Sequence, residues 1–523
     1  MQLSKQVIYL YKKISIQYKI TFYSAIVIGM IAHMPILTNV LVNYDSASMI
    51  PRGYGTGIQS GRFMLTLMGE FMERFWGDFN LPFINSFVAI IILALCVTAI
   101  VFILGIKDNL FCFLCGGLFI SFPAITCTLF FTYTSGYYAV AILITVLAVL
   151  LADKYNKILI PGVLLAFSLG IYQAYYPLAA GLFLLVLVKK CYYAPNDYKE
   201  NIKKAFSFFA ILVIGLILYF IMQRIMQNML GITLNTYQGI SEMGNLKMTD
   251  IPDSILKAYR VYIQLPWKEY CNVNYSGVVR ISLMVVYLFS IITVFIFLQN
   301  KSFKFKIQII LLLVLFPLAA NGIEIMCNEN SIIYSLMVLP LSLIYILPIF
   351  LLEFVNDEWE HSKNFKKSSH KLMVKTVNYI LPVVMVIIMS NYIWGANGNY
   401  TAMFYTNQQT TGYFNGLVNR IKGMDGYNTN MPLAIIGERI NDPSFHNIWG
   451  DSPFHWGGNS AYLIGIYSQN IYIRAFTGYT LPLVSKEEQM KITQNSFVME
   501  MPYYPNDGSI AIVDGVIVVK LSE

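Results

Sequence analysis

Charged residues are scarce in this chain. Asp, Glu, Lys and Arg together make up 12% of its 523 residues, against roughly 25% in an ordinary soluble protein. Hydrophobic residues make up 57%, and many lie in runs of about 18 residues or more, the length that a transmembrane helix needs. The composition therefore excludes an ordinary soluble domain and predicts a polytopic α-helical membrane protein.

Familiar catalytic signatures are also missing from the sequence. No spacing of His, Cys, Asp and Glu is typical of a metal site, and no glycine-rich phosphate loop or nucleophile elbow is present. The net charge of +8 does not indicate a nucleic-acid partner, because the lysines are spread over loops that flank the apolar runs. Chemistry must therefore be sought among isolated polar residues near the membrane surface.

About eleven apolar segments are expected to cross the membrane, with short lysine-bearing loops between them. They are residues 21–42, 81–104, 109–130, 137–151, 158–169, 177–188, 205–223, 281–298, 307–325, 331–352 and 376–394. Residues 1–20 carry lysines among apolar side chains and are not a cleavable signal. We expect them to form an amphipathic helix on the cytoplasmic surface.

The lysines predict the orientation of the chain. Lys107, Lys154, Lys157 and a cluster between residues 363 and 375 fall on one side, whereas the short turns near Thr134 and Gln173 hold no Lys or Arg. The positive-inside rule places the lysine-rich side, with the N-terminus, in the cytoplasm. The long loops 43–80 and 224–280 then lie outside.

The segment from residue 158 to residue 188 is short for two full crossings at about 1.5 Å per residue. We expect two short helices that meet at a polar tip, Tyr172-Gln173-Ala174-Tyr175-Tyr176-Pro177. A second polar tip lies at residues 131–136. Irregular backbone at membrane depth is tolerated where it lines a cavity, so the two tips are predicted to face one outer cavity.

Hydropathy falls after Trp394. Residues 395–523 contain short alternating segments such as Leu433–Ile436 and Val516–Lys520, separated by Gly, Asn and Pro, which is typical of strands and turns. Residues 407–422 have the pattern of one helix. We predict a small extracytoplasmic α/β domain here, after a transmembrane domain over residues 21–394.

Asp45 is the first catalytic candidate. It follows the first apolar segment, where a carboxylate beside a cavity could take a proton from an attacking hydroxyl. Residues 60–76 have a helical period and are predicted to form an interfacial helix that turns Arg62 toward the same place. Arginine suits phosphate because its planar fork binds two oxygens. The alternatives are a solvent-facing Asp45 and an Arg62 that pairs with Glu70, Glu73 or lipid headgroups.

Other polar residues are weaker candidates for binding. Arg224 and Arg280 stand at the membrane junctions of the second long loop and suit either donor phosphate or lipid headgroups. Glu324 is an ionisable residue inside an apolar segment, which favours a functional role. Tyr172, Gln173 and Tyr175 suit sugar recognition or an ordinary aromatic belt. His33 is expected to be a packing residue. A last group of residues could form either a saccharide-binding platform or a local aromatic core. It comprises His446, Trp449, Asp451, His455 and Trp456.

Several short motifs resemble those of the bacterial serotype-converting glucosyltransferases of the Gtr type II family, in the GT-C class of membrane glycosyltransferases. They are Tyr44-Asp45-Ser46, Gly61-Arg62-Phe63, Leu169-Gly-Ile-Tyr-Gln173, Met501-Pro-Tyr-Tyr-Pro505, Gly508-Ser-Ile510 and Val519-Lys-Leu521. The family usually has Trp where this chain has Phe63. The likeness spans most of the chain.

The resemblance implies a GT-C-like fold in a bacterial plasma membrane and a polyprenyl-phosphate-linked glucose, or similar hexose, as donor. The acceptor would be a cell-surface glycan on the outer face, with Asp45 as general base and Tyr44, Glu70 and Glu324 near the sugar or acceptor. A donor synthase and a small flippase would be functional partners. The resemblance and the lack of an acidic cluster predict no cofactor and no metal.

Two other classes remain alternatives. A transporter or flippase of lipid-linked saccharides would predict internal pseudo-symmetry and broken helices in matched halves, and neither stands out in the sequence. A surface-polysaccharide polymerase would rely on outer arginines without a carboxylate in the first loop. An acyltransferase would need a buried catalytic histidine, for which His33 is a poor fit.

Overall fold

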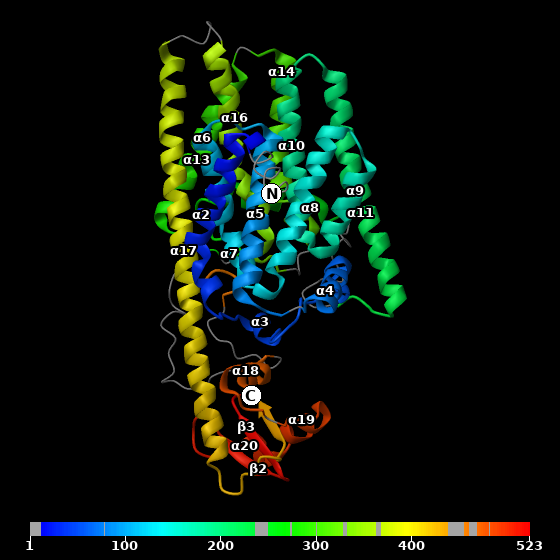
Figure 1. The fold of residues 1–523 in the computed structure, drawn as a ribbon, viewed down its shortest axis with the longest axis vertical. Coiled ribbons are helices and arrows are strands. Elements are labelled where there is room, and N and C mark those ends of the chain that lie inside the picture. Colours follow the sequence, from blue (N-terminus) through cyan, green and yellow to red (C-terminus); the bar gives the residue numbers. More distant parts are fainter. Residues whose placement is uncertain are drawn as a thin grey trace, which may run out of the picture.

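The computed structural model describes residues 12–77, 79–235, 249–271, 273, 275–299, 301–327, 332–361, 368–437, 454–459, 468–480 and 482–522. A long helical bundle forms most of the molecule, and a small α/β unit lies beyond one end of it (Figure 1). Helix α17 runs along the bundle and continues into the α/β unit.

The first half of the bundle begins with α2 and alternates long helices with short ones. Its elements are α2 (Ile16–Thr38), α3 (Tyr44–Ser48), η1 (Ile58–Ser60), α4 (Phe63–Phe75), α5 (Pro82–Leu104), α6 (Asn109–Ser121), α7 (Pro123–Leu129), α8 (Thr132–Tyr155), α9 (Leu159–Ile171), η2 (Gln173–Tyr175) and α10 (Tyr176–Tyr193).

The second half contains the longest helices. Its elements are α11 (Tyr198–Leu230), α12 (Ile251–Gln264), α13 (Gly277–Leu298), α14 (Phe303–Ala320), α15 (Ile323–Met326), η4 (Ser335–Ser342), α16 (Leu343–His361) and α17 (Ser368–Lys422). The α/β unit contains β1 (Leu433–Ile436), α18 (Gln469–Thr477), α19 (Lys486–Thr493), α20 (Ser496–Glu500), β2 (Ile510–Val513) and β3 (Val516–Lys520).

The prediction of a polytopic helical membrane protein is confirmed. Within the described ranges, nine helices are long and apolar enough to cross a membrane, and the pair α6 and α7, bent by 44°, counts as a tenth. The remaining predicted segment is α9, an apolar helix of 13 residues. Each of the about eleven predicted segments thus coincides with a helix, although α2 begins at Ile16 and not after residue 20.

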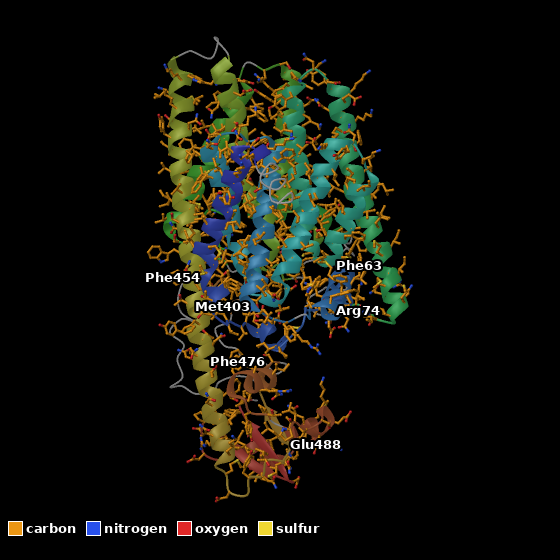
Figure 2. All side chains as sticks on the ribbon, in the orientation of Figure 1. Phe63, Arg74, Met403, Phe454, Phe476 and Glu488 are labelled. Carbon is orange, nitrogen blue, oxygen red and sulfur yellow. The ribbon has the colours of Figure 1, made fainter. Side chains whose placement is uncertain are left out.

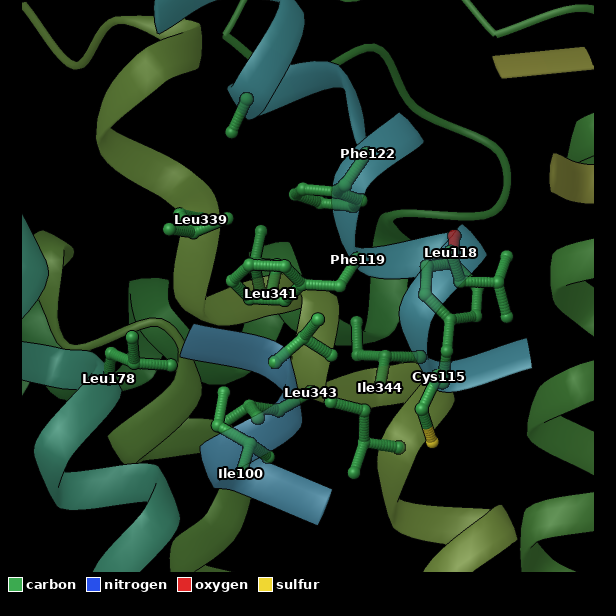
Figure 3. Packing of buried hydrophobic residues seen from close by; sticks show 14 of the residues in the cluster. Ile100, Cys115, Leu118, Phe119, Phe122, Leu178, Leu339, Leu341, Leu343 and Ile344 are labelled. Atoms are coloured by element: carbon green, nitrogen blue, oxygen red, sulfur yellow. The ribbon is translucent and has the colours of Figure 1, made fainter. Parts of the chain in front are cut away.

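The centre of the bundle is packed around η4 and the first half of α16, where every residue from Ser335 to Leu352 is buried. Leu341 and Leu343 lie between α6 on one side and Leu178 of α10 with Ile100 of α5 on the other (Figure 3). Burying a leucine-sized side chain stabilises a fold in water by about 1.5–3 kcal/mol. Inside a bilayer the hydrophobic effect no longer drives helices together, and close van der Waals packing stabilises their association instead.

The boundary predicted near residue 395 is not a break in the chain. Helix α17 continues from Ser368 to Lys422, so the predicted helix 407–422 is its last part. Gly395 and Gly398 stand where the hydropathy changes, and a Cβ there would meet Trp456 at 2.4 Å and Phe454 at 2.3 Å. The two glycines therefore let the aromatic rings of Trp456 and Phe454 pack directly against the helix backbone, and they do not end the helix. Phe454 is labelled in Figure 2.

The α/β unit contains a three-stranded sheet in the order β1-β3-β2. Strand β3 lies parallel to β1 and antiparallel to β2. Asp514 and Gly515 connect the two antiparallel strands with positive φ at both positions, which matches the right-handed twist of a hairpin. Phe414 and Leu417 of α17 pack with Tyr472 of α18 and with Val42 and Ala47. The unit therefore lies directly against α3.

Candidate active site

Asp45 lies in the first turn of α3, and its half-buried side chain is placed by a cap. The Oδ1 atom of Asn43 accepts hydrogen bonds from the backbone N–H of Asp45 at 3.1 Å and of Ser46 at 2.8 Å. The N–H of Asn43 donates in return to Ser46 Oγ at 2.7 Å. This reciprocal cap fixes the short helix, so the position of Asp45 is set by its neighbours in the chain.

Asn407 of α17 fixes the same segment from outside. Its Oδ1 accepts a hydrogen bond from the N–H of Val42 at 2.9 Å, and its Nδ2 donates to the carbonyl of Val42 at 3.0 Å. Both residues are buried. Asn43 Nδ2 donates to the carbonyl of Gly458 at 3.1 Å. The α/β unit and its helix therefore position the Asp45 segment, a role that no local pattern around Asn407 indicates.

Replacing Asn407 with Leu is expected to lower kcat by about 10- to 100-fold with little change in KM, because misplacing a reacting group is costly. Two buried backbone groups of Val42 would lose partners, so the free energy of unfolding should fall by about 1–3 kcal/mol per group. Kinetics and thermal unfolding of the purified protein measure both. Thr401→Ala, an exposed change on the same helix, is the matched control. An unchanged kcat in Asn407→Leu would contradict the positioning role.

Arg62 lies in a cage of tyrosines where loop 43–80 meets α8 and η2. One guanidinium nitrogen donates to Tyr138 Oη at 3.0 Å, and the guanidinium carbon lies 4.8 Å from the centre of the Tyr172 ring. The rings of Tyr138 and Tyr172 stack at 4.4 Å. Arg62 Nε is buried and has no hydrogen-bond partner among the described residues. The cage thus orients the guanidinium and leaves a donor unused.

The electrostatics of the cage keep Arg62 charged. Burial disfavours the cation, but the nearby tyrosines, led by Tyr138 and Tyr172, more than offset this and leave the pKa of Arg62 raised above its ordinary value. Tyr133 lies within electrostatic range of Arg62 and of Asp45. The carboxylate and the guanidinium therefore both lie near Tyr133, although they are 17 residues apart in the chain.

Gly61 allows the turn that presents Arg62. Its φ is +73°, and a Cβ there would lie 2.5 Å from Tyr219 Oη and 2.7 Å from Gln173 Nε2. Gln173 Nε2 donates to the carbonyl of Ser60 and to Tyr219 Oη, each at 3.0 Å. Tyr219 Oη donates to the carbonyl of Gly61 at 3.0 Å. A side chain at position 61 would break this network.

Changing Gly61 to Ala is expected to destabilise the protein by about 1–3 kcal/mol, since positive φ and crowding both oppose a Cβ. It should also raise KM for a substrate that Arg62 binds, by shifting the guanidinium. Gly231→Ala is the matched control, because its φ is +63° and a Cβ there meets no atom within 4 Å. Thermal unfolding of the two variants separates the effect of crowding from that of φ. Equal unfolding temperatures would mean that the contacts at Gly61 contribute nothing.

The family of the chain follows from a comparison with known proteins. A family model described as glucosyl transferase GtrII matches residues 34–344, which is more than half of the chain. The chain belongs to this family. It is therefore a glycosyltransferase, and the expected kinship with the Gtr type II enzymes is confirmed. No curated protein and no solved structure matches the chain.

The matched GtrII region contains Asp45, Arg62 and two hollows that meet beside Gly61. The first is a cavity of about 300 Å³ that is lined by Gly61, Gln173, Tyr219 and Arg224, among others. Arg224 is exposed on α11 and faces this cavity. The structure therefore brings the predicted Arg224 and Gln173 close to the Gly61-Arg62 turn.

The second hollow is an apolar groove of about 770 Å³ between α9, α10, α11 and α14. Its lining is almost entirely hydrocarbon, with Phe183, Phe208 and Leu216 among the residues. Gln173, Tyr219 and Phe220 line both the groove and the smaller cavity. The apolar groove and the polar cavity beside the turn therefore adjoin along these three side chains.

Arg280 and Glu324, two other predicted binding residues, have partners of their own. Arg280 Nε donates to the carbonyl of Tyr275 at 3.1 Å, near the start of α13. Glu324 is buried, accepts a hydrogen bond from Tyr270 Oη at 2.7 Å and forms an ion pair with Lys257 at 2.7 Å. These contacts fasten the chain from α12 to α13 onto the bundle, which is a structural role for both residues.

The interfacial helix α4 differs in part from its prediction. Its buried face contains Leu65, Thr66 and Gly69, whereas Leu67, Phe71 and Phe75 are exposed. Leu67, Phe71 and Phe75 therefore turn away from the protein, as expected for a helix that lies on a bilayer, whereas Phe63 is fully buried. Glu70 is exposed on α4, and Glu73 pairs with Arg52 at 3.5 Å, so neither carboxylate is paired with Arg62.

The remaining aromatic and histidine candidates have clear places. Tyr44 contacts Phe131 edge to face, and Tyr175 is fully buried behind Tyr138 and Tyr172. His33 bonds to Tyr400 and to the carbonyl of Ile120, each at 3.0 Å, and is a packing residue. Trp456 is buried against α17 and His455 is exposed, whereas His446, Trp449 and Asp451 lie outside the described residues.

No group of three or more His, Cys, Asp or Glu side chains that could hold a metal ion occurs in the part of the chain that the structure describes. Independence from metal stays a prediction. Sequence reasoning missed Tyr138, Tyr133, Tyr219 and Asn407. The tyrosines carry no spacing signal, because they come from helices that are adjacent only in the folded bundle.

Proposed function

We propose that the protein transfers glucose, or a similar hexose, from a polyprenyl-phosphate donor to a cell-surface glycan or its lipid-linked precursor. The observation that carries this proposal is an apolar groove that adjoins a polar cavity lined by Arg224 and by Gly61, the residue before Arg62. A lipid-linked sugar needs hydrocarbon lining for its tail and fixed positive charge for its phosphate. The groove supplies the first need, and Arg62 with Arg224 supplies the second.

The proposed reaction is one displacement at the anomeric carbon. Asp45 takes the proton of an acceptor hydroxyl, and the hydroxyl oxygen forms a bond to the anomeric carbon. The bond from that carbon to the phosphate oxygen breaks, and its electron pair leaves with the polyprenyl phosphate. Arg62 stabilises the charge on the leaving group through its unused Nε and its fork. The product has the inverted anomeric configuration.

The proposed location is a bacterial plasma membrane with the site at the outer face. Lysine enrichment at the opposite end of the bundle supports this orientation, and the α/β unit is then extracytoplasmic. A synthase would make the donor on the cytoplasmic face, and a small flippase would move it to the outer face. Membrane lipids surround the exposed apolar side chains.

Filling the groove tests the role of the donor tail. Ala180 lines the groove on α10 and is half-buried. Ala180→Phe is expected to raise KM for a long-chain donor about tenfold, which corresponds to about 1.4 kcal/mol of lost tail binding. KM for a donor with a chain of two isoprene units should not change. Steady-state kinetics with both donors measure the difference.

The matched control is Ala99→Phe, a half-buried position on α5 that does not line the groove. Equal KM values for the long-chain donor in wild type and Ala180→Phe would contradict a tail in this groove. A flippase of lipid-linked saccharides is the second candidate, since the groove would suit its cargo as well. It would move the intact donor across the bilayer and release no polyprenyl phosphate.

A further inference from the structure

A third hollow lies at the other end of the bundle, away from Asp45 and Arg62. It has a volume of about 920 Å³ and is formed by the ends of α8, α10 and α11. Tyr133 of the candidate site and Asn156 of this hollow mark the two ends of α8, which are about 35 Å apart at 1.5 Å per residue. The hollow is therefore separate from the donor path.

Four lysines line this hollow: Lys189, Lys190, Lys203 and Lys204. Lys189 and Lys190 share Asp153, at 3.4 Å and 3.1 Å. Lys203 pairs with Glu200 at 3.6 Å on the exposed rim. Three of the four lysines thus have a carboxylate partner in the hollow, and Asp197 is a third carboxylate of its lining.

Lys204 is different. Its side chain is buried, with 9% of the residue exposed, and its ammonium donates to the carbonyl of Ala152 at 2.6 Å and to Asn156 Oδ1. It also lies over the ring of Phe208 at 4.8 Å. Within the described ranges no carboxylate lies at ion-pair distance from it. A buried cation held only by neutral acceptors is costly without a counter-ion.

The rest of the lining indicates what kind of molecule would carry the negative charge that Lys204 needs. Ile158, Phe206 and Ala210 form an apolar side of the hollow, and Phe206 is 70% exposed. The hollow therefore opens where lysines at a helix end meet lipid-facing side chains. Basic pockets between transmembrane helices on the lysine-rich side are suited to anionic headgroups.

We propose that this hollow binds the phosphate group of an anionic phospholipid, with Lys204 as the main charge contact and the apolar side against the acyl chains. The inference does not depend on the donor or on the role of Asp45. Its ligand is a phosphate ester from the surrounding membrane, and free phosphate offers the same charge without the hydrocarbon.

Lipid binding to the purified, delipidated full-length protein tests this inference. The probes are phosphatidylglycerol, phosphatidylcholine and inorganic phosphate, each titrated in the same detergent and measured by native mass spectrometry. Wild type is expected to bind phosphatidylglycerol roughly tenfold more tightly than phosphatidylcholine. Lys204→Gln should lose this preference, and Lys204→Arg should retain most of it because the charge stays.

Lys154→Gln is the matched control, since Lys154 lies near the same end of α8 but does not line the hollow. A second test leaves Lys204 intact. Ser207 lines the hollow and is half-buried, so Ser207→Glu should repel the headgroup and lower phosphatidylglycerol binding roughly tenfold, whereas Ser207→Gln should not.

Three results would overturn the inference. A preference for phosphatidylglycerol that persists in Lys204→Gln and in Ser207→Glu would assign it to the general lysine surface. Equal affinity of wild type for phosphatidylglycerol and phosphatidylcholine would show that the hollow does not select an anionic headgroup. Displacement of phosphatidylglycerol by millimolar inorganic phosphate in wild type but not in Lys204→Gln would make it a site for the free anion.

Discussion

Asp45→Asn is expected to lower the rate of sugar transfer by about 10²- to 10⁴-fold, the range that a general base contributes. Asn has nearly the same shape as Asp but does not take up the proton of the acceptor hydroxyl. The backbone of α3 is held by Asn43 through N–H groups and by Asn407 through Val42. The variant should therefore fold and insert as wild type does, and only chemistry should be lost.

Transfer kinetics with matched amounts of purified protein measure the effect. Glu73→Gln is a suitable control because Glu73 is a carboxylate of the same outer loop that pairs with Arg52 at the surface. It should transfer sugar at nearly the wild-type rate. Full activity in Asp45→Asn would exclude Asp45 as the base and direct attention to Glu70, an exposed carboxylate of the same outer loop.

Arg62→Lys is expected to lower kcat/KM by about 10²- to 10³-fold, similar to the loss of one preorganised donor in an oxyanion site. Lysine keeps the charge but loses the planar fork that lies over Tyr172 and reaches Tyr138. The free energy of unfolding should change little, because Arg62 is only half-buried and its Nε has no partner among the described residues.

Donor binding and transfer should both be measured for Arg62→Lys, with a non-transferable donor analogue for the binding step. Arg52→Lys is the control, since Arg52 is exposed and contacts Glu73 in the same loop. If Arg62→Lys kept wild-type donor affinity and kcat, the guanidinium would not be a phosphate ligand. If Arg62→Lys lowered the free energy of unfolding as strongly as it lowered activity, the main role of Arg62 would be packing.

The membrane domain was predictable because hydropathy alone identifies long apolar helices. The same method ended a helix near Trp394, where α17 continues through Gly395 and Gly398. Those glycines are explained by Trp456 and Phe454, which lie more than 50 residues later. Local patterns do not contain such contacts, so the continuity of α17 could not be predicted.

The candidate site was predictable only where motifs or topology marked it. Asp45, Arg62 and Gln173 lie in motifs, and Arg224 was singled out by its membrane junction. The cage around Arg62 also needs Tyr138, and the Asp45 segment needs Asn407, 365 positions after Val42. Glu324 has partners that its place in the sequence did not indicate. An acid within an apolar segment favoured function, but Lys257 and Tyr270 from the α12 region satisfy it.

The central claim is that a lipid-linked donor is consumed by chemistry at this site. Its most direct test is wild-type protein in proteoliposomes that contain polyprenyl phosphate glucose, labelled in the sugar, and a lipid-linked glycan acceptor. The account predicts labelled glycan and released polyprenyl phosphate in equal amounts, with no consumption of nucleotide sugar. Movement of intact donor across the bilayer, with no release of polyprenyl phosphate, would contradict the account and identify a flippase.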